Sequence, residues 1–216
     1  MFRDRIDAGQ RLAAALNDLR HQPLPLVVLA IPRGGVLVAC EVARALHAAI
    51  DVCLTHKIGA PGNPELAIGA VADDGATLFD QFMLEEMGVS LAHVEHEVAH
   101  WQKELARRAA AYRGDRPRVP VKDCVAIVVD DGVATGSTLS AALRSTRAAG
   151  AHSVIAAVPV GPAATIRRLS QEADRVVCLS TPYDFWAVGQ FYRSFEQVSD
   201  EEVVAALQAL RDPGTK

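Results

Sequence analysis

Short apolar runs alternate with helix-like segments along this chain of 216 residues, and this alternation constrains the fold more than any other feature. The run from Leu26 to Ile31 has the length of a strand and contains no polar side chain. Strands that are buried on both faces have this composition in parallel sheets. Comparable runs predict further strands at 51–56, 66–72, 77–79, 124–129, 153–158 and 175–179.

The segments between these runs carry apolar residues at helical spacing. They predict helices at 4–20, 36–46, 138–149, 163–172 and 200–211. Ser90 is a suitable N-cap for a further, long helix that ends near Gly114. Strands that alternate with helices of this length predict an α/β fold with a doubly wound parallel sheet. No internal repeat or linker divides the chain, so we expect one domain over residues 1–216.

Composition narrows the classes of function. The net charge of −4 does not indicate a large basic surface, so we expect no nucleic-acid partner. No apolar run approaches the roughly 20 residues that cross a bilayer, and the N-terminus lacks a signal-peptide core. We therefore expect a cytoplasmic protein without a membrane partner. The four cysteines lie far apart in apolar surroundings and are expected to be buried thiols: Cys40, Cys53, Cys124 and Cys178.

The strongest functional signal is the run A-I-V-V-D-D-G-V-A-T-G-S-T at 126–138. Its apolar strand ends at the carboxyl edge of the sheet, where α/β folds bind ligands. The last five residues of the run are small or hydroxylic and open a helix, whose N–H groups and dipole suit a phosphate. Glycine lets the backbone approach the phosphate oxygens. The predicted phosphate loop consists of Ala134, Thr135, Gly136, Ser137 and Thr138.

Two acids, Asp130 and Asp131, precede this loop. They would repel a phosphate that they faced. Their presence is explained if they accept hydrogen bonds from sugar hydroxyls or lie near a cation. A phosphate at one end and a diol at the other describe a ribose 5-phosphate.

A second anion site is predicted at Pro32-Arg33-Gly34-Gly35, a glycine-rich turn between a strand and a helix. Arg33 supplies a positive charge there. Lys57 ends the expected strand 51–56, so its side chain should reach the same edge of the sheet, although it can also be a solvated surface lysine. The Gly, Pro and Asn residues of 57–67 predict a loop.

The run at 126–138, the turn at 32–35 and the stretch K-I-G-A-P-G-N-P-E-L-A-I-G-A-V at 57–71 resemble the type I phosphoribosyltransferases. The resemblance is to predicted bacterial members that stand alone and have no defined substrate. It implies binding of 5-phosphoribosyl-1-pyrophosphate (PRPP), with Asp130 and Asp131 on the ribose hydroxyls. The phosphate loop then holds the 5′-phosphate, and Arg33, Gly34, Gly35 and Lys57 contact pyrophosphate.

The same resemblance implies transfer of the phosphoribosyl group to a nitrogen nucleophile, such as a nucleobase, with release of pyrophosphate. The resemblance also implies Mg²⁺ as cofactor, which would be chelated by the donor, with Asp130 and Asp131 helping mostly through water. Catalytic work falls to Arg33, Lys57, Asp130 and Asp131. We also expect a homodimer.

Two positions depart from the pattern of the family. Ala134 stands where 6-oxopurine members carry an aspartate as general base, although adenine and uracil members also have alanine. A 6-oxopurine acceptor handled through such a base is therefore disfavoured, and no side chain is assigned as general base. Gly132 stands where a larger apolar residue is common.

Six of the 11 aromatic residues fall between 183 and 195. The resemblance implies a core at about 24–180, an insertion at about 73–114, and a hood from 1–23 and 181–216 that holds the nucleobase. We expect Tyr183, Phe185 or Trp186 to stack on that base. A small satellite core or a dimer contact would also concentrate aromatic residues.

Two other functions stay open. A member of the family that senses the donor and regulates a partner would keep the same loops. The segment His96-Glu97-Val98-Ala99-His100 matches H-E-x-x-H, a zinc metallopeptidase motif. Lys103 and Ala106 occupy the places of the glycine and third histidine of the extended motif. A zinc site needs a third ligand, so we favour a solvated, charged helix here.

Overall fold

The computed structural model describes residues 1–211, without the side chains of Pro64, Glu65, Ala67 and Arg211. Five parallel strands form the main sheet in the order β2-β1-β6-β7-β8. Their bounds are β1 Leu26–Ala30, β2 Ala49–Val52, β6 Val125–Val129, β7 Ser153–Val160 and β8 Arg175–Ser180. In register, Ala30 lies opposite Val129, and Val129 lies opposite Ala157. The predicted parallel sheet is confirmed.

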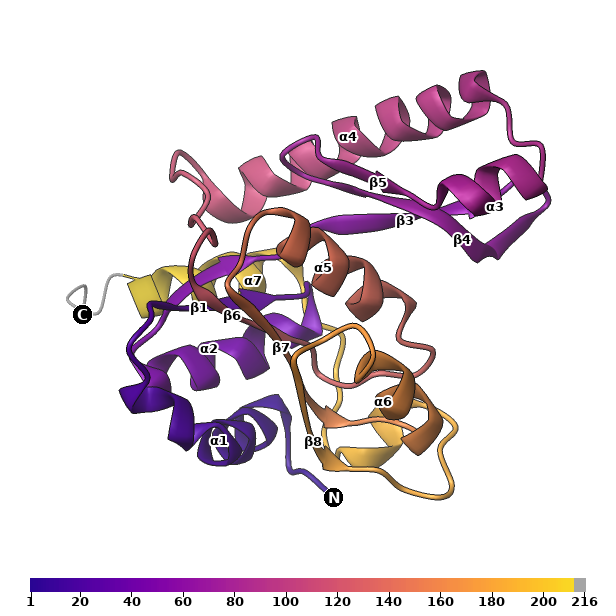
Figure 1. Cartoon of the computed structure of the whole chain (residues 1–216). Helices are drawn as coiled ribbons and strands as arrows, with labels where there is room; N and C mark the ends of the chain where they lie inside the picture. Colours follow the sequence, from indigo (N-terminus) through magenta and orange to yellow (C-terminus); the bar gives the residue numbers. More distant parts are fainter. Residues whose placement is uncertain (212–216) are drawn as a thin grey trace.

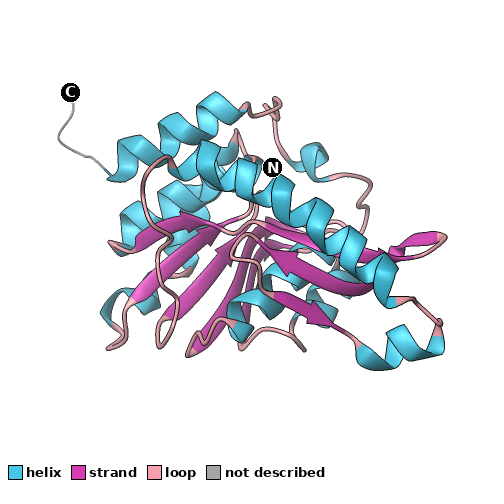
Figure 2. Ribbon diagram, turned by 90° about the horizontal axis from the view of Figure 1, so that it is seen from above, coloured by secondary structure: helices cyan, strands magenta, loops and turns pink. Residues whose placement is uncertain are grey.

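Helices cover both faces of this sheet (Figure 2). One face carries α1 (Arg5–Ala15), α2 (Gly34–Leu46) and α7 (Asp200–Arg211), and the other carries α5 (Ser137–Ala148) and α6 (Ala163–Leu169). Val28 packs in the first core, whereas Val27 packs with Leu139 and Leu143 of α5 in the second. Successive strand residues point to opposite faces, so a sheet covered on both sides requires strands that are apolar throughout.

A second, antiparallel sheet contains β3 (Thr55–Ala60), β4 (Asn63–Ala72) and β5 (Thr77–Phe79). Helices α3 (Gln81–Glu86) and α4 (Leu91–Arg113) come after it in the chain. Figure 1 shows this unit projecting beyond the main sheet, with α4 alongside its strands. It spans 55–113 and so includes two strands ahead of the segment expected as an insertion. The N-cap of α4 is as predicted, because Ser90 Oγ accepts a hydrogen bond from His93 N at 3.2 Å.

Two predictions for this region are wrong. The expected strand 51–56 is interrupted: β2 ends at Val52, and β3 begins at Thr55 in the other sheet. The expected loop 57–67 is a β-hairpin whose turn contains Pro61 and Gly62, with Gly62 at φ 75°. Turn residues that suggested a long loop from the sequence therefore close a tight hairpin.

A buried arginine anchors the second unit to the main sheet. Arg113, at the end of α4, donates hydrogen bonds to Asp51 Oδ1 and Oδ2 (2.9 and 3.1 Å), to Asp73, and to the carbonyl of Val52 (3.0 Å). The side chains of Arg113, Asp51 and Asp73 are 8%, 1% and 3% exposed. The C-terminal turn of α4 is thus held against the end of β2.

The N-terminal residues lie against the segment at 191–193, which precedes α7. Phe2 N donates to the carbonyl of Phe191 at 2.8 Å, and Arg193 N donates to the carbonyl of Phe2 at 2.9 Å. The expected helix 4–20 is α1 followed by a 3-10 helix, η1 (Asn17–His21), and a second 3-10 helix, η2 (Val188–Phe191), precedes Tyr192. Residues 212–216 of the expected hood lie outside the described residues.

Within residues 1–211, no helix combines the length and apolar character that crossing a bilayer requires. The four cysteines, all within residues 1–211, form no disulfide; Cys40, Cys53 and Cys124 are buried, as predicted, and Cys178 is partly buried. Burial raises the pKa of the Cys53 thiol to about 12.

Candidate phosphate- and sugar-binding site

Two loops predicted to bind the donor meet at the carboxyl edge of the main sheet. They come directly after the neighbouring strands β1 and β6, and Ile31 N donates to the carbonyl of Val129 at 2.9 Å. A Cβ atom on Gly34 would lie 1.9 Å from Asp131 Oδ2, and one on Gly35 would lie 2.9 Å from Asp130 Cα. The absence of side chains at these two glycines lets the first loop, in which the Pro32–Arg33 peptide bond is cis, pack directly on the acid pair.

The acid pair sits in an unfavourable environment for negative charge. Burial and the neighbouring charge of Asp131 raise the pKa of Asp130 well above its ordinary value, although the Asp131 N–H donates to Asp130 Oδ1 at 2.8 Å. Burial also raises the pKa of Asp131, and the contact with Arg5 opposes that rise. Hydroxyl donors or a cation at this place would favour the ionised carboxylates. The electrostatics therefore suit a diol.

Sequence reasoning missed Arg5, which is part of this site. Arg5 Nε donates to Asp131 Oδ2 at 2.7 Å, and the two side chains are 10% and 14% exposed. Its NH1 group donates to the carbonyl of Glu196 at 2.8 Å, and its guanidinium carbon lies 3.9 Å from the ring centroid of Phe195. A carboxylate has about four lone-pair sites, so the contact leaves room for a ligand hydroxyl. No sequence pattern connects residues 126 positions apart.

The phosphate loop leaves its backbone donors available. The N–H groups of Ala134, Thr135 and Gly136 donate no hydrogen bond to any residue within 1–211, and no side chain caps the start of α5. The carbonyl of Ala134 accepts a hydrogen bond from Thr165 Oγ1 at 2.8 Å, and that of Thr135 accepts one from Arg168. Side chains of α6 thus bind the carbonyl groups of the loop, and the N–H groups of the loop remain available for an anion.

Gly136 shapes the mouth of this loop. It adopts φ 76°, the left-handed conformation, which glycine takes without steric cost. A Cβ atom there would also lie 2.8 Å from Thr165 Cγ2. Thr135 Oγ1 and Ser137 Oγ lie 3.3 Å apart, and Thr138 is exposed. The loop therefore combines free N–H groups with hydroxyls.

The two predicted cations lie in different cavities. Lys57 is on β3 opposite Ala70, so the prediction that it ends a strand of the main sheet is wrong. It nevertheless lines a cavity of about 220 Å³ together with Ser137 of the phosphate loop, Arg144 and Arg168. Arg33 lines another cavity, of about 420 Å³, beside α4 and α7.

The aromatic segment, residues 183–195, contacts the acid pair and the residue after it. A Cβ atom on Gly132 would lie 2.4 Å from Val188 Cγ1, which explains glycine at a position where the family commonly has a larger residue. Tyr192 Oη donates to the carbonyl of Asp131 at 2.5 Å. Trp186 and Tyr183 are exposed, whereas Phe185 is partly buried with its ring stacked on Phe191 at 5.3 Å between centroids.

The carboxylates of Asp130 and Asp131 fit a magnesium ion only if a bound substrate supplies further ligands. Mg²⁺ binds proteins through one or two carboxylates, keeps several waters and takes phosphate oxygens from its substrate. Asp130 and Asp131 supply two carboxylates, and no cluster of three or more His, Cys, Asp or Glu side chains within the described residues is placed to hold a metal. His96 and His100 are exposed on α4, and the described part of the chain provides no third zinc ligand near them.

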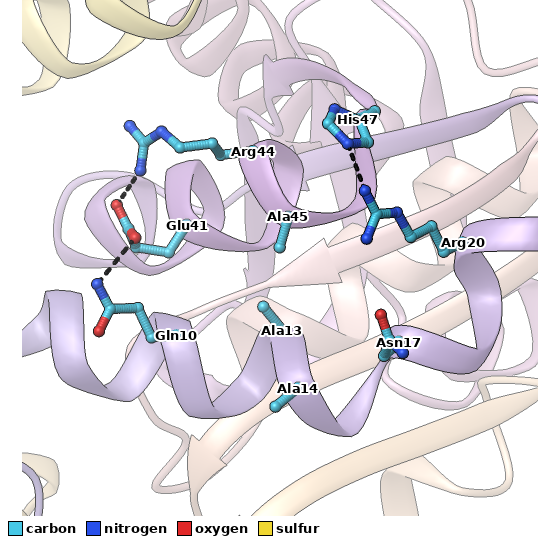
Figure 3. A pocket seen from close by; sticks show the side chains of 9 residues that line it. All are labelled: Gln10, Ala13, Ala14, Asn17, Arg20, Glu41, Arg44, Ala45 and His47. Atoms are coloured by element: carbon cyan, nitrogen blue, oxygen red, sulfur yellow. Dashed lines mark hydrogen bonds and ion pairs between the residues drawn. The ribbon is translucent and has the colours of Figure 1, made fainter.

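Another cavity, of about 470 Å³, lies between α1 and the C-terminal half of α2, at the opposite end of α2 from Gly34. Figure 3 shows Glu41 paired with Arg44 and Gln10, and Arg20 beside His47, with 2.7 Å between Arg20 NH2 and His47 Nε2. None of the predicted site residues lines it.

Similarity to known proteins identifies the family of this chain. The profile of the family "Phosphoribosyl transferase domain" matches residues 3–196. Two proteins of Mycobacterium tuberculosis, "Putative phosphoribosyl transferase Rv0571c" of strain H37Rv and "Putative phosphoribosyl transferase MT0597" of strain CDC 1551, are each 46% identical over 213 residues. The match covers 98% of this chain and 48% of each of those proteins, so the chain spans about half the length of these curated relatives.

A solved structure covers nearly the whole chain. The crystal structure of TT1426 from Thermus thermophilus is 45% identical in sequence, with a TM-score of 0.89 over 96% of this chain and 97% of that one. The profile and the curated relatives name the same family, and this structure shares the fold of the chain. The chain belongs to the phosphoribosyltransferase family.

Proposed function

We propose that this protein binds PRPP and transfers its phosphoribosyl group to a nitrogen nucleophile, a nucleobase or related heterocycle, with release of pyrophosphate. One observation carries the proposal: the free N–H groups of Ala134 to Gly136 lie shortly after an acid pair on which a second glycine-rich loop packs. Membership of the family supports it.

In this proposal each part of the donor has a partner. The 5′-phosphate binds the N–H groups of the phosphate loop, with hydroxyls from Thr135, Ser137 and Thr138. The ribose hydroxyls donate to Asp130 and Asp131, which favours the ionised carboxylates. The pyrophosphate lies along the backbone of Gly34 and Gly35, near the side chains of Arg33 and Lys57.

The reaction breaks the bond between C1 of the ribose and the pyrophosphate oxygen, and the electron pair leaves with pyrophosphate. A bond forms between C1 and the acceptor nitrogen, whose proton passes to solvent. Positive charge that develops on the ribose is stabilised by the two carboxylates, and negative charge on pyrophosphate by Arg33 and Lys57. Magnesium, when bound with the donor, supplies further positive charge to the pyrophosphate oxygens. The residues act by charge and by positioning.

The acceptor lies against the aromatic segment in this proposal. Trp186 and Tyr183 are exposed, and Phe185 stacks on Phe191 in the same segment. That segment reaches the loop after β6 through Tyr192, whose hydroxyl donates to the carbonyl of Asp131. Stacking of a base on an aromatic ring contributes about 1–3 kcal/mol. Trp186→Ala should therefore raise KM for the acceptor by about tenfold, with the affinity for PRPP unchanged.

Release of pyrophosphate tests the proposal. The protein is incubated with PRPP, Mg²⁺ and each member of a panel of nucleobases and related heterocycles. We expect turnover with at least one acceptor. Tight binding of PRPP without turnover for any acceptor would contradict transfer, and it would favour a regulatory protein that senses the donor.

A further inference from the structure

The cavity beside Arg33 lies outside the two predicted loops, apart from Pro32 and Arg33 themselves. It has a volume of about 420 Å³ and lies where the loop before α2, the C-terminal part of α4 and the start of α7 meet. Its lining is almost entirely polar and consists of Pro32, Arg33, Arg107, Arg108, Tyr112 and Asp200. Arg33 belongs both to this cavity and to the loop on which we place pyrophosphate.

The charge of the lining favours an anion. The lining carries three guanidinium groups and one carboxylate. Glu104 lies outside the lining and pairs with Arg107 and Arg108, so one positive charge remains in excess when it is counted. The carboxylate of the lining, on Asp200, is already engaged: it accepts a hydrogen bond from Tyr112 Oη at 2.6 Å and lies 4.0 Å from Arg33 NH1. A guanidinium group can donate two parallel hydrogen bonds to the oxygens of one phosphate. Several guanidinium groups around one cavity therefore suit a polyphosphate.

Arg107 and Arg108 of α4 can reorient toward a ligand at a small cost in free energy. Both are paired with Glu104 of the same helix, with Arg107 Nε at 2.9 Å and Arg108 Nε at 2.8 Å from its carboxylate oxygens. Their side chains are 62% and 46% exposed, and ion pairs in such positions contribute little to stability. The terminal NH1 and NH2 groups of Arg108 donate no hydrogen bond to residues 1–211.

The backbone that carries these arginines is held in place. Arg113 fixes the last turn of α4 against β2 through Asp51 and Asp73, five residues after Arg108. Tyr112 is buried, and its hydroxyl reaches the start of α7. The cavity therefore has a rigid frame and two adaptable cationic side chains.

We propose that Arg107 and Arg108 of α4 bind the pyrophosphate group of the donor and of the released product, opposite Arg33. This inference rests on the proposed function and deepens it. It assigns part of the binding of pyrophosphate to α4, in addition to the turn at 32–35. Stabilisation of the leaving group then comes from Arg107 and Arg108 of α4 in addition to Arg33 and Lys57.

Calorimetric titration with inorganic pyrophosphate and Mg²⁺ tests this assignment. Arg107→Ala with Arg108→Ala should weaken binding at least about tenfold, because charge-assisted hydrogen bonds are lost. Lys103→Ala removes a positive charge from an exposed position of α4 outside the cavity, and its affinity should match that of the unaltered protein. Glu104→Gln frees both guanidinium groups, so it should strengthen binding or leave it unchanged.

The outcomes separate this inference from the proposed function. If the double arginine variant binds pyrophosphate as tightly as the unaltered protein, or if Glu104→Gln weakens binding as much as the arginine changes do, the inference is overturned. The proposed function then still stands, provided that the unaltered protein binds PRPP and the acid-pair variants do not. If the unaltered protein binds neither PRPP nor pyrophosphate, both fall.

Discussion

Asp131 shows how a single residue of this site depends on partners that are remote in sequence. Its carboxylate meets Arg5 from the start of the chain, and its carbonyl meets Tyr192 from near the end. Asp130 and Asp131 could be predicted from sequence, because an acid pair after a buried strand is a local pattern. Arg5, Thr165 and Arg168 could not, because only folding brings them to the loops.

The raised pKa of Asp130 predicts that this residue costs stability at neutral pH. A carboxyl whose pKa is raised in the folded state favours folding while it stays protonated, and that advantage is lost as the pH rises from its ordinary value of 3.8 through the folded-state pKa. Asp130→Asn removes this titration. The free energy of unfolding of the variant, relative to the unaltered protein, should therefore increase between pH 4 and pH 8 in urea titrations. An equal difference at both pH values would contradict the charge argument.

Arg5 is predicted to position and ionise Asp131. Arg5→Met keeps an apolar stem but removes the charge that opposes the rise in the pKa of Asp131. PRPP affinity should fall about tenfold at neutral pH, and part of the loss should be recovered as the pH rises. A variant with lower stability but an unaltered pH profile of PRPP binding would show that Arg5 has only a structural role.

At the scale of elements, the sequence predicted the strands of the main sheet because two buried faces require uninterrupted apolar runs. It failed between Val52 and Thr55, where the apolar run continues while the chain changes sheets. Cys53 N still donates to Ala30 O in the main sheet at 2.8 Å, whereas Leu54 O accepts from Asp73 N beside the second sheet, at 3.1 Å. Cys53 and Leu54, which connect the two sheets, are both buried and apolar. Their residue types therefore do not mark the point where the chain leaves the main sheet.

Gly136, at the start of α5, is predicted to be needed for both stability and phosphate binding. Gly136→Ala forces an L residue into a left-handed conformation, which costs about 1–2 kcal/mol, and it crowds Thr165. The free energy of unfolding should drop by at least that amount, and phosphate binding should weaken because the loop must move. Gly62→Ala, at a left-handed turn with open space around it, is the matched control: it should lose stability without losing affinity for PRPP.

At the scale of the whole molecule, three parts separated in sequence meet at one edge of the main sheet: the chain ends, the paired loops and the antiparallel unit. The family resemblance predicted an α/β core and a phosphate loop, but the placement of α4 beside Arg33 depends on a buried arginine with two aspartates. A lone Arg113 at a helix end, and Asp73 in a turn, are ordinary in sequence and become a network only after folding.

This network should be a main determinant of global stability. Arg113→Met leaves two buried carboxylates without their cation, and breaking a buried pair in this way costs about 3–5 kcal/mol. Urea unfolding should show the loss, whereas Lys103→Met on the same helix should stay within about 0.5 kcal/mol of the unaltered protein. A loss for Arg113→Met as small as that of the control would contradict the anchoring role.

Calorimetric titration with PRPP and Mg²⁺ tests the central claim most directly, because it asks whether the acid pair and the phosphate loop form a donor site. The unaltered protein, and the control Asp115→Asn at an exposed position, should bind PRPP with a single saturable transition. Asp130→Asn with Asp131→Asn should weaken binding about a hundredfold or more, since hydrogen bonds to charged groups contribute about 1.5–3 kcal/mol each. Unchanged affinity in the double variant, with its fold intact, would contradict the account.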